Sequence, residues 1–139
     1  MKKKFALSLV ALASVAVLTA CGEVKSGASN ATGNPVDEKV IKIGFNFEET
    51  GAVAAYGTSE QKGAQLAVDQ INAAGGVDGK QIEVVDKDNK SETAEAASVS
   101  TNLVTQSKVA AIVGPATSGA TAAAVANATQ AAVPLISPS

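Results

Sequence analysis

The chain has 139 residues, of which 46% are hydrophobic and 17% are charged, and its formal net charge at pH 7 is −2. This length and composition are typical of one soluble globular domain. The sequence has no arginine, no histidine and one cysteine. It therefore lacks the basic stripe that nucleic-acid binding needs, and it lacks the residues of a Ser/His/Asp triad, a Cys/His pair or a zinc site.

The first twenty residues are predicted to be a signal peptide. Met1–Lys4 is positively charged, and Phe5–Leu18 is apolar but too short for an ordinary membrane span. A buried N-terminal helix is the alternative, but it leaves the three leading lysines unexplained. The stretch LTAC, which ends at Cys21, is similar to a bacterial lipobox, in which the cysteine receives a diacylglyceryl group. Because two acyl chains give stable anchoring, we expect Cys21 to hold the exported protein on the outer face of the cytoplasmic membrane.

The sequence divides the chain into three parts. Residues 1–20 form the lipoprotein signal peptide. Residues 21–38 are rich in Gly, Ser, Asn and Thr without an apolar period, so they are expected to form a flexible tether. Residues 39–139 are expected to form the folded lobe.

Within the folded lobe, strands alternate with helices. The pattern predicts a strand over 40–47, a helix over 58–74, a strand over 81–85, a helix opening at Ser91, a strand over 109–113, a helix over 119–132 and a strand starting at Pro134. A capping box at Thr58–Gln61 marks the start of the first helix. Strands separated by helices run parallel through right-handed crossovers, so we predict an α/β fold, a doubly wound parallel sheet with helices on both faces.

Topology predicts where a ligand would bind. In the common strand order 2-1-3-4, the loops after strands 1 and 3, residues 48–57 and 114–118, border a crevice at the carboxyl ends of the strands. The second loop opens the third helix, whose unpaired N–H groups and dipole favour an anion. Ser118 could donate its hydroxyl to that anion or simply cap the helix. Tyr56, the only tyrosine, could pack on a ligand or serve as a peripheral packing residue.

The residues of this turn indicate which kind of anion it could bind. Gly114–Thr121 has the spacing of a P-loop, GxxxxGK[ST], except that Ala120 replaces the lysine. A polyphosphate is normally met by that lysine and a metal ion, so one carboxylate is the better match, and neither a cofactor nor a metal is expected. Glu48 and Glu49 are adjacent on an extended loop and should point apart. Asp86–Asn89 copies only the opening of a calcium loop and is expected to be a solvated strand end.

Several blocks together resemble a known family. LTAC, VIKIGFNFEETGAVAAYG, VAAIVGPATSGAT and VPLISPS are similar to the amino-terminal lobe of branched-chain amino acid ABC transporter substrate-binding lipoproteins, which have the type 1 periplasmic binding protein fold. The resemblance covers residues 40–139. It implies a set of ligand-binding residues: Tyr56, Thr117, Ser118, Gly119 and Ser139.

The resemblance also implies a role for each part of that set. The ligand carboxylate would be held by the Ser118 hydroxyl and by backbone N–H groups of the same loop. Tyr56 would pack against the ligand, and the Ser139 carbonyl would accept a hydrogen bond from the ammonium group. The acidic partner of that ammonium would belong to a second lobe, so the chain is expected to be one truncated lobe of a two-lobe binding protein.

The function implied is that of a non-enzymatic extracellular receptor. It would capture an aliphatic L-amino acid, leucine, isoleucine or valine, in the cleft between two lobes and deliver it to ABC permease subunits. Two alternatives stay open at this point. One is a nucleotide-binding enzyme with a degenerate P-loop, and the other is a receptor of the same family for another amino acid or an amide.

Overall fold

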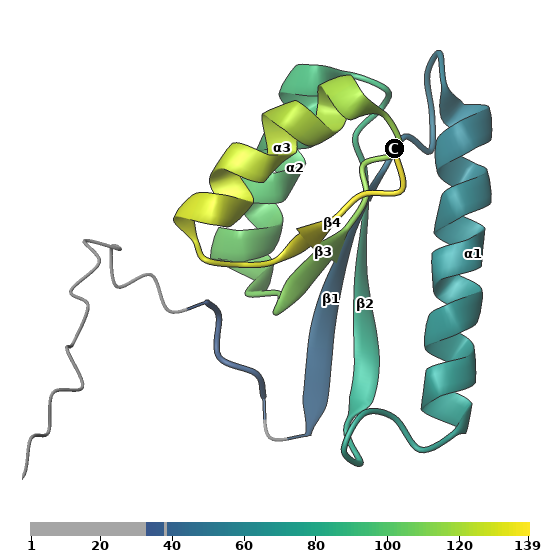
Figure 1. The fold of residues 1–139 in the computed structure, drawn as a ribbon, viewed down its shortest axis with the longest axis vertical. Helices are drawn as coiled ribbons and strands as arrows, with labels where there is room; N and C mark the ends of the chain where they lie inside the picture. The colour runs from purple at the N-terminus through teal and green to yellow at the C-terminus, as the bar shows by residue number, and fades with distance from the viewer. Residues whose placement is uncertain (1–32, 38) are drawn as a thin grey trace, which may run out of the picture.

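The structure is a computed structural model, and it describes residues 33–37 and 39–139 (Figure 1). The predicted signal peptide, the predicted lipidation site Cys21 and the tether as far as residue 32 lie outside the described residues. In the part of the chain that is described, no helix is both long and apolar enough to cross a membrane.

The described chain forms one parallel sheet with three long helices. Its elements are β1 (Val40–Phe47), α1 (Ala54–Ala73), β2 (Gln81–Asp88), α2 (Thr93–Asn102), the π-helical turn η1 (Leu103–Ser107), β3 (Ala111–Val113), α3 (Ser118–Gln130) and β4 (Leu135–Ile136). The strands lie in the order β2-β1-β3-β4 and all pairs are parallel. The predicted 2-1-3-4 sheet is therefore confirmed.

Helices cover both faces of the sheet, as predicted. Helix α1 lies on one face, and α2 and α3 lie side by side on the other (Figure 1). The side chains of β1 reach the packed layers on both faces of the sheet, because successive side chains of a strand point to opposite faces. Phe45 and Phe47 are buried on the α1 side with their rings edge to face, 5.7 Å apart. Gly44 faces the other side, where a Cβ atom would come within 2.8 Å of the Leu103 side chain.

Several element boundaries differ from the prediction by one or two residues: β3 begins at Ala111 rather than at residue 109, and α2 begins at Thr93 rather than at Ser91. The largest differences are at the start of α1 and at the end of β2. Helix α1 begins at Ala54 rather than at residue 58, and the predicted capping box is wrong because the Thr58 hydroxyl donates to the Ala54 carbonyl inside the helix, at 2.7 Å. The first turn of α1 is held by tertiary packing against the end of β1. Strand β2 continues three residues beyond the predicted end, to Asp88, which is paired with Phe47 of β1. Backbone pairing with β1 extends this strand although its last side chains are polar.

Candidate functional site

The two predicted crevice loops lie at the same edge of the sheet. Strands β1 and β3 are neighbours in parallel register, with Phe45 opposite Val113. The loops after them, residues 48–53 and 114–117, therefore leave adjacent strand ends at the point where the strand order reverses. This is the position at which open α/β sheets bind ligands.

One buried carboxylate joins these loops. Glu48 follows β1 and is 0% exposed. Its carboxylate accepts hydrogen bonds from the Ala116 N–H and from the Thr117 hydroxyl, both at 2.8 Å. Hydrogen bonds to an ionised acceptor are about twice as strong as neutral ones, so Glu48 fixes the β3–α3 loop to the end of β1. No local sequence pattern indicated this role for Glu48.

The main chain of Glu48 also packs against the first turn of α1. Gly57 is buried, and a Cβ atom placed on it would lie 2.3 Å from the Glu48 carbonyl oxygen. Tyr56 precedes Gly57 in the same turn, and the residue is 66% exposed. Tyr56 is thus held beside the crevice loops while its ring stays out of the core, as a ligand-contacting ring requires. Its contact with a ligand remains a prediction.

The start of α3 carries the donors expected for an anion. Thr117 is the N-cap by position, but its hydroxyl bonds Glu48 instead of capping the helix. The interpretation of Ser118 as a helix cap is therefore wrong, because Ser118 is the first residue of the helix. Ser118 and Gly119 are exposed, and the described part of the chain contains no hydrogen bond to the Ser118 hydroxyl. The first N–H groups of a helix have no intrahelical partners, so hydroxyl and backbone donors coincide here.

The last described residues lie beside the first turn of α3. The Ser137 hydroxyl donates to the Pro115 carbonyl at 2.8 Å, and the Ser139 hydroxyl lies 3.3 Å from the Thr121 hydroxyl in the first turn of α3. The structure therefore brings the predicted residue Ser139 next to the turn that holds Ser118. Whether its carbonyl receives an ammonium group remains a prediction.

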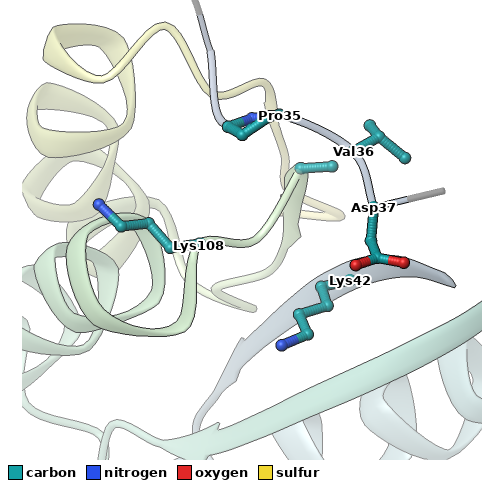
Figure 2. A pocket seen from close by; sticks show the side chains of 6 residues that line it. Pro35, Val36, Asp37, Lys42 and Lys108 are labelled. Carbon is teal, nitrogen blue, oxygen red and sulfur yellow. The ribbon is translucent and has the colours of Figure 1, made fainter. Parts of the chain in front are cut away.

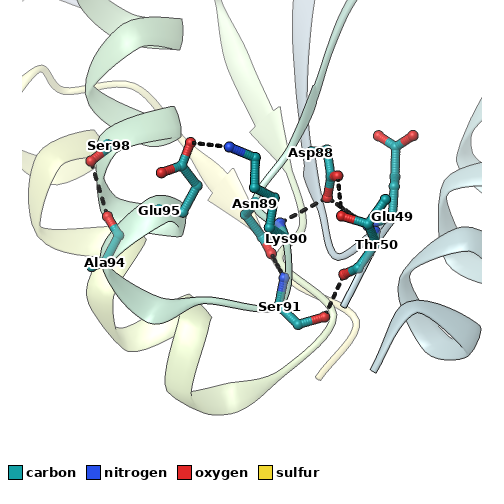
Figure 3. A network of polar contacts seen from close by, with 9 residues as sticks. All are labelled: Glu49, Thr50, Asp88, Asn89, Lys90, Ser91, Ala94, Glu95 and Ser98. Atoms are coloured by element: carbon teal, nitrogen blue, oxygen red, sulfur yellow. Dashed lines mark hydrogen bonds and ion pairs between the residues drawn. The ribbon is translucent and has the colours of Figure 1, made fainter. Parts of the chain in front are cut away.

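The end of β2 and the β2–α2 loop hold the first crevice loop from the side of β1 opposite β3 (Figure 3). The Asp88 carboxylate accepts hydrogen bonds from the N–H groups of Glu49, Thr50 and Lys90 and from the Thr50 hydroxyl, at 2.6 to 3.2 Å. Burial acts to raise the pKa of Asp88, but these hydrogen bonds outweigh it and hold that pKa below its usual value. Asn89 is 0% exposed. The expected solvated strand end is therefore wrong for Asp88 and Asn89, which bind the first crevice loop or its strand, whereas Asp86 and Lys87 are exposed as expected.

Glu49 points away from Glu48, as predicted, toward the β2 carboxylates. Burial, a hydrogen bond with Asp86 and the negative charges of Asp86 and Asp88 together raise the pKa of Glu49 from its usual 4.5 to about 7. Glu60 on α1 also has a raised pKa, first because of burial and then because of the charge on Glu48. The carboxyl edge of the sheet is thus a concentration of negative charge around the first crevice loop.

This cluster predicts a pH dependence of stability. Because the pKa of Glu49 is higher in the folded state than its usual 4.5, the folded state binds more protons between these values, and its stability is fully present below pH 4.5 and lost as the pH rises through about 7. Glu49→Gln should be more stable than the unsubstituted protein at pH 8, and this advantage should disappear at pH 4.5. Urea unfolding at both pH values measures it. Asp86→Asn should reduce the pH dependence, and an equal Glu49→Gln advantage at both pH values would contradict the assignment.

A separate cavity lies at the opposite end of the sheet. Its volume is about 220 Å³, and it is lined by Pro35, Val36, Asp37, Lys42, Lys108 and Ala110 (Figure 2). The Asn34 side-chain amide holds one wall in place by donating to the carbonyls of Val104 and Val109, at 2.9 Å each. The end of the predicted tether is therefore attached to the lobe near the amino end of β3. No predicted ligand-binding residue lines this cavity.

Comparison with known proteins assigns the fold to a family. A family model described as a periplasmic binding protein matches residues 40–139. The chain belongs to the periplasmic binding protein family. One similar solved structure is the branched-chain amino acid transporter substrate binding protein LivJ from Streptococcus pneumoniae strain Canada MDR_19A in complex with isoleucine. It is 88% identical to this chain with a TM-score of 0.72, and the matched region spans 73% of this chain and 29% of LivJ.

Two more distant relatives agree with this periplasmic binding protein assignment. The solved structure of the leucine binding protein LivK from Thermotoga maritima is 31% identical, has a TM-score of 0.66 and covers 72% of this chain and 28% of its own. The Leu/Ile/Val-binding protein BraC3 of Rhizobium johnstonii is 39% identical over 85 residues, which are 61% of this chain and 23% of the relative. The predicted resemblance to branched-chain amino acid receptors is confirmed, and the chain spans less than a third of each relative.

Proposed function

We propose that this periplasmic binding protein chain is the amino-terminal lobe of an extracellular receptor of an ABC importer that captures leucine, isoleucine or valine. The receptor has no catalytic role in this proposal. It is exported, is held by lipid at Cys21 on the outer face of the cytoplasmic membrane, and passes its ligand to permease subunits. The isoleucine bound by the 88% identical relative supports this choice of ligand.

The exposed start of α3 is the observation on which the proposal depends. Ser118 and Gly119 present a hydroxyl and unpaired N–H groups at the positive end of a helix of 13 residues. Each charge-assisted hydrogen bond to a carboxylate contributes about 1.5 to 3 kcal/mol. A single carboxylate matches this arrangement, and the exposed ring of Tyr56 could cover the aliphatic part of the ligand.

The nucleotide-binding alternative is disfavoured by Glu48. In a P-loop, the backbone N–H groups of the loop face the phosphates. Here the Ala116 N–H, inside the P-loop-like stretch, is bonded to the Glu48 carboxylate at 2.8 Å. A polyphosphate would meet this buried negative charge without the lysine that Ala120 replaces. A receptor for another amino acid or an amide would use the same donors, and ligand competition distinguishes it from the proposed receptor.

Substitution of Ser118 tests the site. The experiment uses an extended receptor, defined as residues 1–139 of this chain continued by the remaining sequence of the 88% identical S. pneumoniae relative. We expect Ser118→Ala to weaken L-leucine binding about tenfold to a hundredfold, because one charge-assisted hydrogen bond is lost. Isothermal titration calorimetry measures the affinity. Ser98→Ala is the matched control, since Ser98 is an exposed serine on α2 that bonds only its own helix, through the Ala94 carbonyl.

The outcomes separate the alternatives. Unchanged affinity of Ser118→Ala would remove Ser118 from the site. Binding of MgATP rather than an amino acid by the unsubstituted extended receptor would favour the nucleotide-binding alternative. Tighter binding of an amide or a polar amino acid than of leucine would keep the receptor class and change its ligand.

A further inference from the structure

We propose that Glu48 is a positioning residue for ligand binding, which acts by holding the Ser118-bearing turn and the Tyr56-bearing turn in one geometry. The proposal rests on the function proposed above. Glu48 does not contact the ligand in this scheme. It acts through Thr117, a member of the implied ligand-binding set, and through Ala116 and Gly57, which lie beside the turn of Ser118 and the turn of Tyr56.

The contacts of Glu48 reach both sides of the crevice. Its side chain bonds the Ala116 N–H and the Thr117 hydroxyl, the two positions directly before Ser118. Its main chain lies against Gly57, the position directly after Tyr56, so closely that a Cβ atom on Gly57 would be 2.3 Å from the Glu48 carbonyl oxygen. A shift of Glu48 would therefore move the α3 donors relative to the tyrosine ring.

Because Glu48 is buried, its hydrogen bonds hold the loop before α3 in one position. Glu48 is 0% exposed, so its carboxylate cannot exchange its two protein donors for bulk water without opening the loop. Thr117, although it stands at the N-cap position, gives its hydroxyl to Glu48 and makes no side-chain cap. The loop before α3 is thus fixed by a neighbouring strand end rather than by its own helix, and the donor positions of α3 depend on Glu48.

Substitutions of Glu48 can distinguish the effect of its hydrogen bonds from the effect of its charge. Glu48→Gln keeps both contacts, because its amide oxygen can accept from the Ala116 N–H while its amide nitrogen donates to the Thr117 hydroxyl, which can accept. Glu48→Ala removes both contacts. Thr117→Val removes one contact and keeps the side-chain shape. A residue that acts by position should be replaceable by glutamine but not by alanine.

The test measures L-leucine affinity of the folded extended receptor by calorimetry, together with its urea unfolding. We expect at least tenfold weaker binding for Glu48→Ala, threefold to tenfold weaker binding for Thr117→Val, and affinity within about threefold of the unsubstituted receptor for Glu48→Gln. Val104→Ala is the control for lost stability alone, since Val104 is a buried core residue on the α2 side of the sheet. It should lower the unfolding midpoint and leave the affinity unchanged.

Each outcome decides something different. If Glu48→Ala loses stability but its folded fraction binds leucine like the unsubstituted receptor, Glu48 is a structural residue only and the inference is overturned. If Glu48→Ala does not fold, Thr117→Val decides, and unchanged affinity there overturns the inference. If the unsubstituted extended receptor binds no branched-chain amino acid, the proposed function fails, and this inference fails with it.

Discussion

Gly57→Ala is expected to destabilise the lobe by about 1 to 3 kcal/mol, whereas Gly63→Ala is expected to stabilise it by up to about 1 kcal/mol. Both glycines lie inside α1, so both substitutions gain the same helix propensity. A Cβ atom on Gly57 would lie 2.3, 2.6 and 2.7 Å from the O, C and N atoms of Glu48, whereas a Cβ atom on Gly63 would meet nothing within 4 Å. The clash is with backbone, which cannot rotate away, so α1 or the end of β1 must move.

Urea unfolding of the extended receptor and its two variants measures the difference. The Gly57→Ala receptor should also bind leucine more weakly, because the displaced turn carries Tyr56. Equal stability of the two alanine variants would show that the first turn of α1 does not pack on Glu48 as described. Circular dichroism at matched concentration checks that helix content is retained in each variant.

Asn46→Ala is expected to cost about 2 to 4 kcal/mol of stability, the second large effect. Asn46 is 0% exposed in β1. Its amide nitrogen donates to the Ala96 carbonyl at 3.0 Å, and its amide oxygen accepts from the Asn89 side chain at 3.1 Å. Alanine would remove the side-chain donor to the Ala96 carbonyl, leave the buried Asn89 amide nitrogen without its partner and open a small cavity, and these costs add.

Two further variants identify the cause. Asn102→Ala, at an exposed asparagine at the end of α2, should stay within about 0.5 kcal/mol of the unsubstituted receptor. Asn46→Asp keeps the side-chain size but replaces the donor to the Ala96 carbonyl with an oxygen, so it should be strongly destabilised at neutral pH. If Asn46→Asp is as stable as the unsubstituted receptor, the hydrogen-bond network contributes nothing and the loss in Asn46→Ala is one of packing.

The outline of the fold followed from local pattern. The alternation of Val40–Phe47 gives a strand with two apolar faces, and helices placed between strands require parallel crossovers, so the parallel sheet and its layers were predictable. The strand order 2-1-3-4 was expected only as the common order of such sheets. Element ends were not, because they depend on contacts with other elements. The extra turn of α1 is an example, since it rests on the main chain of Glu48 through Gly57.

The sequence by itself determined the position of the proposed ligand-binding turn, because a run of small residues between a strand and a helix, as in Gly114–Thr121, places the first N–H groups of the helix at a strand end. Only the tertiary structure decided which polar side chains hold that turn in place. Glu48 and Ala116 are 68 positions apart, and no local pattern specifies which distant donor a buried carboxylate will meet. The physical reason is that a buried polar group must have a hydrogen-bond partner, and only the topology of the sheet brings the two partners close together.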